Sequence, residues 1–327
     1  HLMTNHEILS EYRQFGGPHD FSIIEGNKGL HDGLDLKGSD SNAALARLIG
    51  APVVLVIDAR GMTRGIAPLV NGHANFDKNI VIAGIILNFV GGTRHESKLI
   101  NAIDYYTDAS VVGSISQCNE LNISERHLGL IPSNEIRTPS KIIKSVSSII
   151  SENVNLDSIM QTAKKFSSKQ SDIPKFSESS GNPLVRIAIA RDKAFGFYYP
   201  NDLNMLEREG AEIHYFDALN DPILPTVDGL FIGGGFPETN ASKLAENKSL
   251  RNNIKLALVN GLPTYAECGG LIYLSKNLIW KNKTYEMVGF IPGNTVIRNR
   301  PVGRGYVMLS ETHAHPWPDR VPIDTLV

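Results

Sequence analysis

Short apolar runs alternate with helix-like segments along this chain, and this alternation limits the folds open to it. In the first half, nearly continuous β-rich runs occupy Phe21–Ile24, Pro52–Ile57, Ile80–Leu87 and Ser110–Ile115. Strands buried on both faces of a helix-covered parallel sheet have this pattern. The covering helices are predicted at Ser41–Ile49 and Arg94–Tyr105. The order of strand and helix predicts an α/β domain.

A second set of the same kind begins after residue 183. Its predicted strands are Val185–Ala190, Glu212–Phe216, Gly229–Ile232 and Pro263–Ala266. Before it lie two predicted helices, Lys141–Ile150 and Leu156–Phe166, and a linker-like stretch over 165–182 that is rich in Ser and Lys. A length of 327 residues suits two domains. We therefore predict domains over 1–140 and 184–327, joined by a helical and linker segment over 141–183.

Composition argues against several classes of protein. The formal net charge is −2, whereas a dedicated nucleic-acid binder carries a basic surplus, so we expect no nucleic-acid partner. No apolar run approaches the roughly 20 residues of a membrane span, so we expect no membrane partner. Cys118 and Cys268 lie far apart and lack a zinc-type spacing. This cysteine usage predicts a reduced, cytoplasmic protein.

The segment 265–270, YAECGG, carries the clearest chemical signal, because it follows a predicted strand and precedes a predicted helix. A nucleophile on such a tight turn needs small neighbours, and Ala266 and Gly270 flank Cys268 two residues away on either side. The helix N-terminus would favour the thiolate, and the N–H of Gly269 could donate to an oxyanion. The pattern predicts Cys268 as a nucleophile, with a buried, unreactive cysteine as the alternative.

The segment 233–238, GGGFPE, follows the predicted strand that ends at Ile232. Consecutive glycines allow a close backbone approach, so the N–H groups of Gly234 and Gly235 can face a developing negative charge. By itself this loop could bind phosphate or form a plain turn. Followed by the cysteine turn, it resembles the oxyanion loop of class I, triad-type glutamine amidotransferases. The pair is similar to that of the cobyrinic acid diamide synthase and cobyric acid synthase group.

Neighbouring residues resemble the same group. Arg186–Asp192 and the segment AFGFYYP at 194–200 are similar to the family's V-A-R-D-x-A-F-x-F-Y-Y. Three aromatic side chains of this segment could pack in the core or contact substrate: Phe195, Phe197 and Tyr198. A triad also needs a histidine base oriented by an acid. In this family that histidine lies well beyond the Gly-Tyr pair at 305–306, so we assign no general base and expect His313 and His315 to be loop residues.

The resemblance implies ATP chemistry in the first half, because the carboxylate that receives the amide must be activated first. An intact Walker A sequence, G-x-x-x-x-G-K-[ST], does not occur, although Gly33 and Gly38 have its glycine spacing. In the family the phosphate loop would precede residue 1. The resemblance therefore implies a P-loop NTPase-like, dethiobiotin-synthetase-like domain over 1–140 that lacks its P-loop, followed by a flavodoxin-like glutamine amidotransferase domain that is incomplete at its C-terminal end.

Three residues of the first half match site positions of the family. The segment EGNKGLHDG at 25–33 resembles E-G-x-x-G-L-Y-D-G, and Glu25 and Asp32 occupy its acidic positions. A carboxylate at the end of a buried strand is well placed to hold Mg²⁺ beside phosphates, so Glu25 is predicted as a Mg²⁺ ligand and Asp32 as a nucleotide-site residue. Asn88 matches the asparagine that reads the adenine edge of ATP. The alternatives are that Asp32 only caps a turn and that Asn88 only helps to form a turn.

Over nearly its whole length the chain resembles the cobyrinic acid a,c-diamide synthases, and we expect it to be truncated at both ends. The resemblance implies a C–N ligase that amidates the a and c carboxylates of a corrinoid or related tetrapyrrole with ATP, Mg²⁺ and L-glutamine. A homodimer is compatible with the resemblance. The segment ERHLGL at 125–130 belongs to this likeness. We expect residues 1–327 by themselves to be inactive.

Alternatives remain open at this point. Asn27, Lys28, His31 and the segment RGMTRG at 60–65 look closer to a siroheme-amidating branch. Cobyric acid synthase has related domains but amidates other carboxylates. A non-enzymatic ParA/MinD-like nucleotide switch would share the first fold but would carry no glutaminase motifs.

Overall fold

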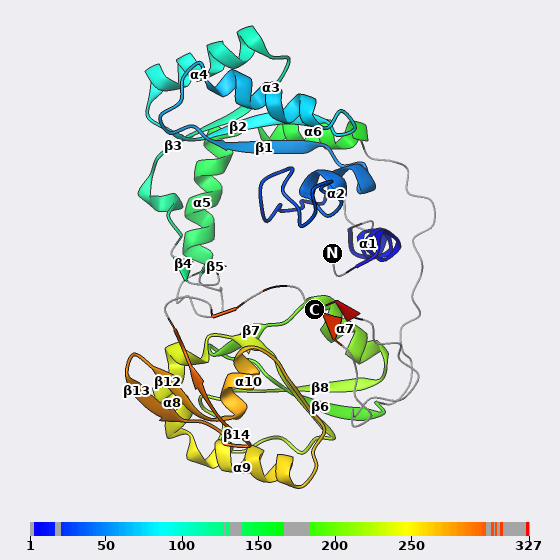
Figure 1. Ribbon diagram of the computed structural model, residues 1–327, viewed down its shortest axis with the longest axis vertical. Coiled ribbons are helices and arrows are strands. Elements are labelled where there is room, and N and C mark those ends of the chain that lie inside the picture. The colour runs from blue at the N-terminus through cyan, green and yellow to red at the C-terminus, as the bar shows by residue number, and fades with distance from the viewer. Residues whose placement is uncertain are drawn as a thin grey trace. The chain divides into compact units, whose positions relative to one another are not determined.

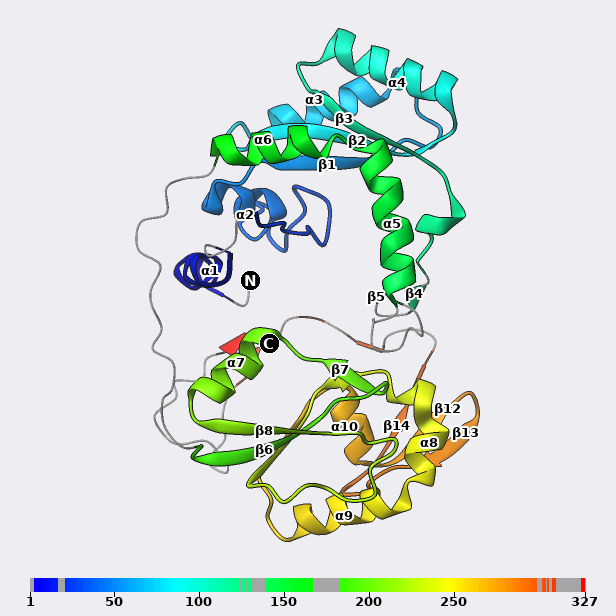
Figure 2. The ribbon, with the colours of Figure 1, turned by 180° about the vertical axis from the view of Figure 1, so that it is seen from behind.

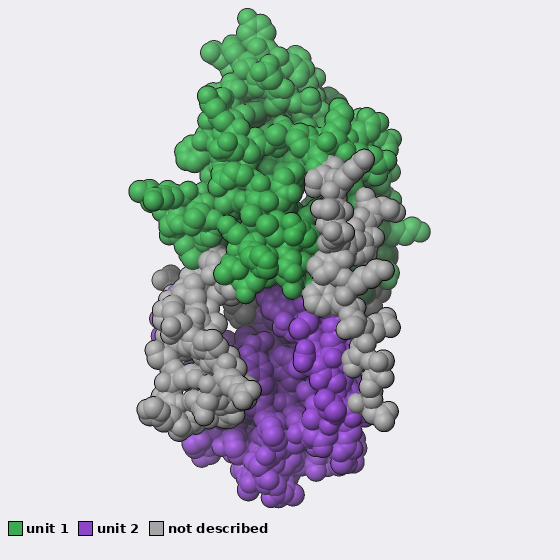
Figure 3. All heavy atoms as spheres, turned by 90° about the vertical axis from the view of Figure 1, so that its right-hand side faces the viewer, with its two compact units in different colours: residues 1–124, 138–175, 306–327 green, residues 125–137, 176–305 purple. Residues whose placement is uncertain are grey.

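The chain divides into two units, each with its own parallel sheet and hydrophobic core. Unit 1 comprises 1–124, 138–175 and 306–327, and unit 2 comprises 125–137 and 176–305 (Figure 3). In this computed structural model the described residues are 3–16, 21–123, 125–126, 129–130, 139–166, 183–298, 302–303, 305, 308–309 and 325–326.

Unit 1 is built on a three-stranded parallel sheet in the order β1-β2-β3. The strands are β1 (Val53–Asp58), β2 (Ile82–Val90) and β3 (Val111–Ser116). Helices α3 (Ile66–Phe76) and α4 (Thr93–Tyr106) connect them and lie side by side along the sheet (Figure 1). The core between these helices and the strands includes Ile57, Ile66, Val70, Ile85, Leu87, Leu99 and Ile103. The predicted α/β class is confirmed.

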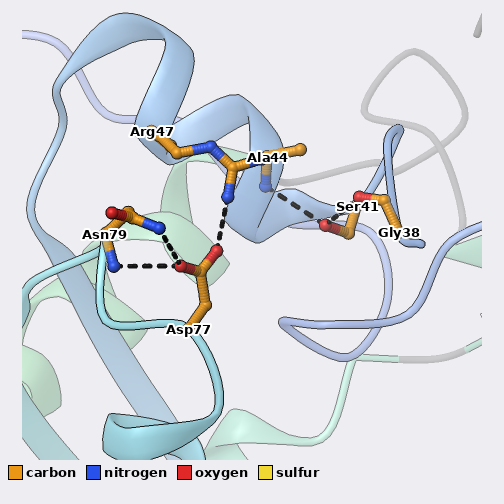
Figure 4. A network of polar contacts seen from close by, with 6 residues as sticks. All are labelled: Gly38, Ser41, Ala44, Arg47, Asp77 and Asn79. Atoms are coloured by element: carbon orange, nitrogen blue, oxygen red, sulfur yellow. Dashed lines mark hydrogen bonds and ion pairs between the residues drawn. The ribbon is translucent and has the colours of Figure 1, made fainter.

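Helix α2 (Asn42–Ile49) begins at a side-chain cap. The hydroxyl of Ser41 accepts the backbone N–H of residue 44 at 3.1 Å and donates to the carbonyl of Gly38 at 2.7 Å (Figure 4). At the other end of the helix, Arg47 forms an ion pair with Asp77 at 2.5 Å. The loop that has the glycine spacing of a Walker A sequence is therefore organised by its own turn and cap contacts.

The remaining elements of unit 1 are mostly helical. They are α1 (Asn5–Glu11), a π-helical turn (Tyr12–Gly16), a 3-10 turn (Asn119–Leu121), α5 (Pro139–Asn153), α6 (Leu156–Phe166) and the short pair β15 (Met308–Leu309) and β16 (Thr325–Leu326). Helix α6 lies along β2 and β3 (Figure 2). The two predicted helices of the segment 141–183 are thus present, and both contact the sheet of unit 1.

The predicted strand Phe21–Ile24 is wrong. Residues 21–26 form neither helix nor strand, and the side chain of Ile23 is 84% exposed. A strand requires a hydrogen-bonded neighbour, and the sheet in unit 1 pairs β1, β2 and β3 without this segment. Apolar composition alone could not supply the missing partner.

Unit 2 contains a four-stranded parallel sheet in the order β11-β9-β6-β8. The strands are β6 (Val185–Ala190), β8 (Ala211–Phe216), β9 (Gly229–Ile232) and β11 (Thr264–Ala266), close to the predicted ranges. Because all four run in the same direction, the residues that follow them gather at one edge. Ligand sites of open α/β sheets occupy this carboxyl edge.

The other elements of unit 2 are helices, turns and strands that belong to smaller sheets. They are β4 (Glu125–Arg126), β5 (Gly129–Leu130), β7 (Phe195–Phe197), α7 (Pro200–Arg208), β10 (Gly234–Gly235), a 3-10 turn (Pro237–Asn240), α8 (Ala241–Glu246), α9 (Lys248–Val259), α10 (Gly269–Leu274), β12 (Ser275–Trp280), β13 (Lys283–Glu286) and β14 (Ile291–Val296). Among the described helices of both units, none combines the length and apolar character needed to cross a membrane.

Helix α9 offers a matched test of the core of unit 2. Ile254 is fully buried in that core, whereas Leu256, two residues further on, is 58% exposed. Ile254→Ala should lower the free energy of unfolding by about 2–5 kcal/mol, since a buried side chain leaves a cavity. Leu256→Ala should change it by about 0.5 kcal/mol or less. Urea unfolding followed by Trp280 fluorescence, in a Trp317→Phe background, checks both, and equal losses would contradict this core assignment.

Candidate active site

Cys268 lies at the turn between β11 and α10, as predicted. Strand β11 is paired with β9, with Ala266 opposite Ile232, and the turn follows directly. Cys268 has φ 47° and ψ −109°, a backbone conformation that side-chain-bearing residues rarely adopt. Its side chain is exposed. The alternative of a buried cysteine is therefore wrong, and a strained, accessible thiol at the carboxyl edge of a sheet has the geometry of a nucleophile elbow.

Glycines after the cysteine allow this turn to sit directly on the neighbouring strand and loop. A Cβ on Gly270 would lie 2.1 Å from the carbonyl oxygen of Ile232, and one on Gly269 would lie 3.0 Å from the backbone nitrogen of Gly235. The first spacing is impossible for any side chain. The N–H of Gly270 also donates to the carbonyl of Gly233 at 3.1 Å. The elbow and the glycine loop are thus packed backbone against backbone.

The glycine loop lies next to Cys268. A Cβ on Gly234 would lie 3.7 Å from the Cβ of Cys268, so this part of the loop is next to the thiol-bearing residue. Gly234 and Gly235 form β10, which pairs antiparallel with β7. The structure therefore brings Gly234, Gly235 and Gly269 together around Cys268. Their role as oxyanion donors remains a prediction.

Tyr265 and Glu267 lie close to Cys268 in sequence and contact each other. The Tyr265 hydroxyl donates to Oε2 of Glu267 at 3.1 Å. Burial and this neighbouring carboxylate raise the pKa of Tyr265 above its ordinary value. No histidine base is identified. Among the described residues of unit 2, His214 is the sole histidine, and it lies on β8, at the opposite edge of the sheet from β11. His313 and His315 lie outside the described residues.

The segment that follows β6 contributes aromatic side chains in three different ways. Phe195 is fully buried against Tyr273, and Phe197 packs edge-to-face on Phe236 at 5.3 Å between ring centres. Tyr198 donates its hydroxyl hydrogen to the carbonyl of Ala190. The two alternatives for these rings were core packing and substrate contact, and core packing accounts for Phe195.

Asp192, in the same segment, is a carboxylate held by backbone donors. Its Oδ1 accepts the N–H of Ala194 at 2.6 Å, and its Oδ2 accepts the N–H of Ala218 at 2.7 Å. Burial raises the pKa of Asp192 to about 6, and the nearby Asp217 acts in the same direction, whereas the backbone donors oppose the shift. Arg191, Lys193, Lys243 and Asp217 line the same pocket as Asp192.

In unit 1, the structure does not support the strand-end argument for Glu25. Its backbone belongs to the exposed segment that pairs with no described strand. Asp32 closes a turn, because its N–H donates to the carbonyl of Gly29 at 3.2 Å. Among the described residues, no group of three or more His, Cys, Asp or Glu side chains could hold a metal ion. The functional roles of Glu25 and Asp32 remain predictions.

Asn88 lies inside β2, not beyond its end, in register with Asp58 at the end of β1. Its Oδ1 accepts the N–H of Phe89 at 3.0 Å, and Phe89 has a φ of 57°. Arg60 binds both carboxylate oxygens of Asp58 and lies 4.5 Å from the centre of the Phe89 ring. A strained residue, an ion pair and Asn88 thus meet at the carboxyl edge of the unit 1 sheet, where such folds bind ligands.

His95 is a residue of this edge that the sequence analysis missed. Its Nδ1 accepts the N–H of Gly91 at 3.0 Å, which assigns the ring proton to Nε2. Nε2 then donates to the carbonyl of Met62 at 2.7 Å. His95 therefore ties the loop after β1 to the loop after β2. Only the fold brings these residues together, since 33 positions separate His95 from Met62.

Comparisons with known proteins show which proteins this chain is similar to. Residues 186–316 match the family model of the CobB/CobQ-like glutamine amidotransferase domain. The chain is 39% identical to the cobyrinate a,c-diamide synthase of Magnetococcus marinus over 328 residues, covering 99% of this chain and 70% of the relative. It is 40% identical to that of Methanosarcina acetivorans, covering 91% and 65%, and 41% identical to that of Picrophilus torridus, covering 87% and 64%. The chain thus spans about two thirds of the length of these relatives.

Gly270 provides a direct test of the elbow geometry. Gly270→Ala should lower the free energy of unfolding of unit 2 by about 1–3 kcal/mol, because the new methyl group would meet the carbonyl of Ile232. It should also change the rate at which Cys268 is alkylated by iodoacetamide in a Cys118→Ser background. Gly293→Ala is the matched control, because a Cβ there would meet nothing within 4 Å. Equal melting temperatures and alkylation rates for both variants would contradict this packing.

The raised pKa of Asp192 predicts that the folded chain becomes less stable as the pH rises. Its pKa is higher in the folded chain than the ordinary value of 3.8, so protonation favours the folded state. The resulting stabilisation is complete below about pH 4 and is lost as the pH rises through about 6, by up to about 3 kcal/mol. Urea unfolding of the wild type between pH 4 and 7 should show this loss, and Asp192→Asn should not. Parallel pH curves for the two proteins would contradict the shift.

Proposed function

Because this chain belongs to the cobyrinate a,c-diamide synthase family, we propose that the protein forms amides on the a and c carboxylates of a corrinoid or related tetrapyrrole. Glutamine supplies the nitrogen and ATP activates the carboxylates. The observation that carries this proposal is the strained, exposed Cys268 against the glycine loop, within the segment that matches a glutamine amidotransferase domain.

The glutaminase half of the reaction uses the elbow. The Cys268 thiolate attacks the carboxamide carbon of glutamine, and the carbonyl oxygen becomes an oxyanion. Backbone N–H groups of Gly234, Gly235 and Gly269 would stabilise that charge. Hydrogen bonds of this kind speed the reaction because they are stronger in the transition state than in the bound substrate. Collapse of the intermediate, with a proton delivered to the leaving nitrogen, releases ammonia and leaves a thioester. Water then hydrolyses the thioester to glutamate and restores the thiol.

The amidation half would belong to unit 1. A carboxylate of the tetrapyrrole attacks the γ-phosphorus of ATP, which gives an acyl phosphate and ADP. Ammonia then attacks the acyl carbon, and inorganic phosphate leaves as the amide forms. Positioning and neutralisation of charge dominate phosphoryl transfer. The parallel sheet of unit 1, with ligand-binding geometry at its carboxyl edge, supports a P-loop NTPase-like assignment for this half.

The residues of unit 1 are compatible in chemistry with Mg²⁺. Glu25 and Asp32 both carry exposed carboxylates, the ligand type that this ion prefers. Mg²⁺ usually takes only one or two protein carboxylates and completes its shell with phosphates and water, so the lack of a larger acidic cluster among the described residues is no obstacle. When bound, Mg²⁺ would neutralise charge on the phosphates. The Asn88 side chain would recognise the adenine edge of ATP.

The nucleotide-switch alternative is disfavoured, because such proteins carry no glutaminase domain and residues 186–316 match one. Which tetrapyrrole is amidated is a finer proposal. The relatives that match over most of the chain are named as cobyrinate a,c-diamide synthases, which favours cobyrinate over siroheme or the substrate of cobyric acid synthase. A cytoplasmic location and a homodimer remain predictions.

Two sets of variants separate the half-reactions in the full-length protein. Cys268→Ala should abolish amidation with glutamine but retain amidation with ammonium chloride, because only nitrogen release needs the thiol. Glu25→Gln and Asp32→Asn should lower amidation from both nitrogen sources by about 10-fold or more, while glutamine hydrolysis persists. Amide product and glutamate are measured by mass spectrometry with ATP, Mg²⁺ and cobyrinate.

Glu96→Gln is a matched control, since Glu96 lies in the first turn of α4 and has no proposed role. Glutamine-dependent product from Cys268→Ala would disprove the proposed nucleophile. Wild-type turnover of ammonia by both acidic variants would remove Glu25 and Asp32 from the site.

A further inference from the structure

One hydroxyl group connects β6, an inner strand of the unit 2 sheet, to the glycine loop. The Tyr198 hydroxyl accepts the backbone N–H of Gly233 at 3.0 Å and donates to the backbone carbonyl of Ala190. Ala190 is the last residue of β6, and Gly233 is the first residue of the loop. A single side chain therefore satisfies one polar group on each of two segments that are far apart in sequence.

Gly233 also contacts the elbow through its other polar group. Its carbonyl accepts the N–H of Gly270, two residues after Cys268, at 3.1 Å. The ring of Tyr198 lies against Gly233, since a Cβ on that glycine would be 2.6 Å from the Cε1 atom of the ring. A continuous set of contacts thus runs from Ala190 through Tyr198 and Gly233 to the turn that holds the thiol.

Asp192 supports the same loop by a second route. Besides the N–H groups of Ala194 and Ala218, its carboxylate accepts the N–H of Phe195 at 3.2 Å. Phe195 is the first residue of β7 and is paired with Gly235 in β10. A Cβ on Gly235 would lie 2.0 Å from the carbonyl oxygen of Ala194, so the two segments are in direct backbone contact. Asp192 therefore orders the strand on which Gly234 and Gly235 rest.

We propose that Tyr198 and Asp192 are positioning residues of the glutaminase, which hold the glycine loop at the distance from Cys268 that oxyanion binding requires. The inference rests on the proposed function of Cys268 and adds two residues that do not themselves touch the reacting atoms. Oxyanion donors act through placement that is set before the reaction, and a displacement of about 1 Å can cost about 100-fold in rate. A loop that loses one anchor should therefore bind glutamine normally and stabilise the transition state poorly.

A purely structural role for Tyr198 makes a different prediction. The Tyr198 ring packs edge-to-face on Phe231, with ring centres 5.2 Å apart. If packing were the whole role, removing the hydroxyl would matter little, whereas shrinking Phe231 would loosen the ring. If positioning is the role, the hydroxyl itself is required, because no other atom of the ring can bond to Gly233 and Ala190 at once.

The test uses the full-length protein and three variants: Tyr198→Phe, Asp192→Asn and the control Tyr199→Phe. Tyr199 is adjacent in sequence and 76% exposed. For Tyr198→Phe and Asp192→Asn we expect kcat for glutamine hydrolysis to fall by about 10- to 100-fold, with KM for glutamine within about twofold. Amidation with ammonium chloride should stay at the wild-type level. Tyr199→Phe should match the wild type in every assay.

Several outcomes would overturn the inference. They are a wild-type kcat for Tyr198→Phe, an equal loss with glutamine and with ammonia, and a rise in KM without a fall in kcat. If Asp192→Asn does not fold, Tyr198→Phe decides alone, because it removes one oxygen atom and keeps the ring. If Cys268→Ala abolishes glutamine use while Tyr198→Phe is fully active, the positioning role fails and the proposed function stands.

Discussion

The contact between two backbones, at Gly233–Gly235 and at Gly269–Gly270, is the constraint on which the candidate active site depends. A Cβ at Gly270 would sit 2.1 Å from the Ile232 carbonyl, so the elbow can reach β9 only if it carries no side chain there. This close approach leaves the glycine loop beside Cys268, where its N–H groups can meet developing charge. Glycine is used here for the space it leaves, at the entropic cost that glycine always carries.

The strain at Cys268 is maintained by contacts on both sides of it. Before the cysteine, β11 is paired with β9; after it, the N–H of Gly270 donates to the carbonyls of Glu267 and Gly233. A positive φ on a side-chain-bearing residue costs about 1–3 kcal/mol and persists only when its surroundings over-determine it. Here hydrogen bonds and close backbone contacts hold Cys268 in this conformation. Tyr198 and Asp192 extend the same support one layer outward, to β6 and β7.

Both units place candidate site residues at the carboxyl edge of a parallel sheet, where open α/β sheets generally bind ligands. In unit 2 this edge carries Cys268 after β11. In unit 1 it carries the Asp58–Arg60 ion pair at the end of β1 and Asn88 on β2, and His95 joins the two following loops. The two proposed half-reactions, glutamine hydrolysis and carboxylate activation, would each use the carboxyl edge of its own sheet.

The sequence by itself determined the strands of both sheets, the cysteine turn and the glycine loop, because each depends on neighbours within a few residues: apolar runs, small flanking residues and consecutive glycines. It could not determine pairing. Phe21–Ile24 has the composition of a strand but pairs with no strand in the described part of the chain, and the Tyr198 hydroxyl reaches a glycine 35 positions later. Hydrogen bonds join groups that folding brings together, and nothing in the local pattern around Tyr198, Asp192 or His95 specifies the distant backbone group that each one binds. Tertiary structure alone decided those contacts.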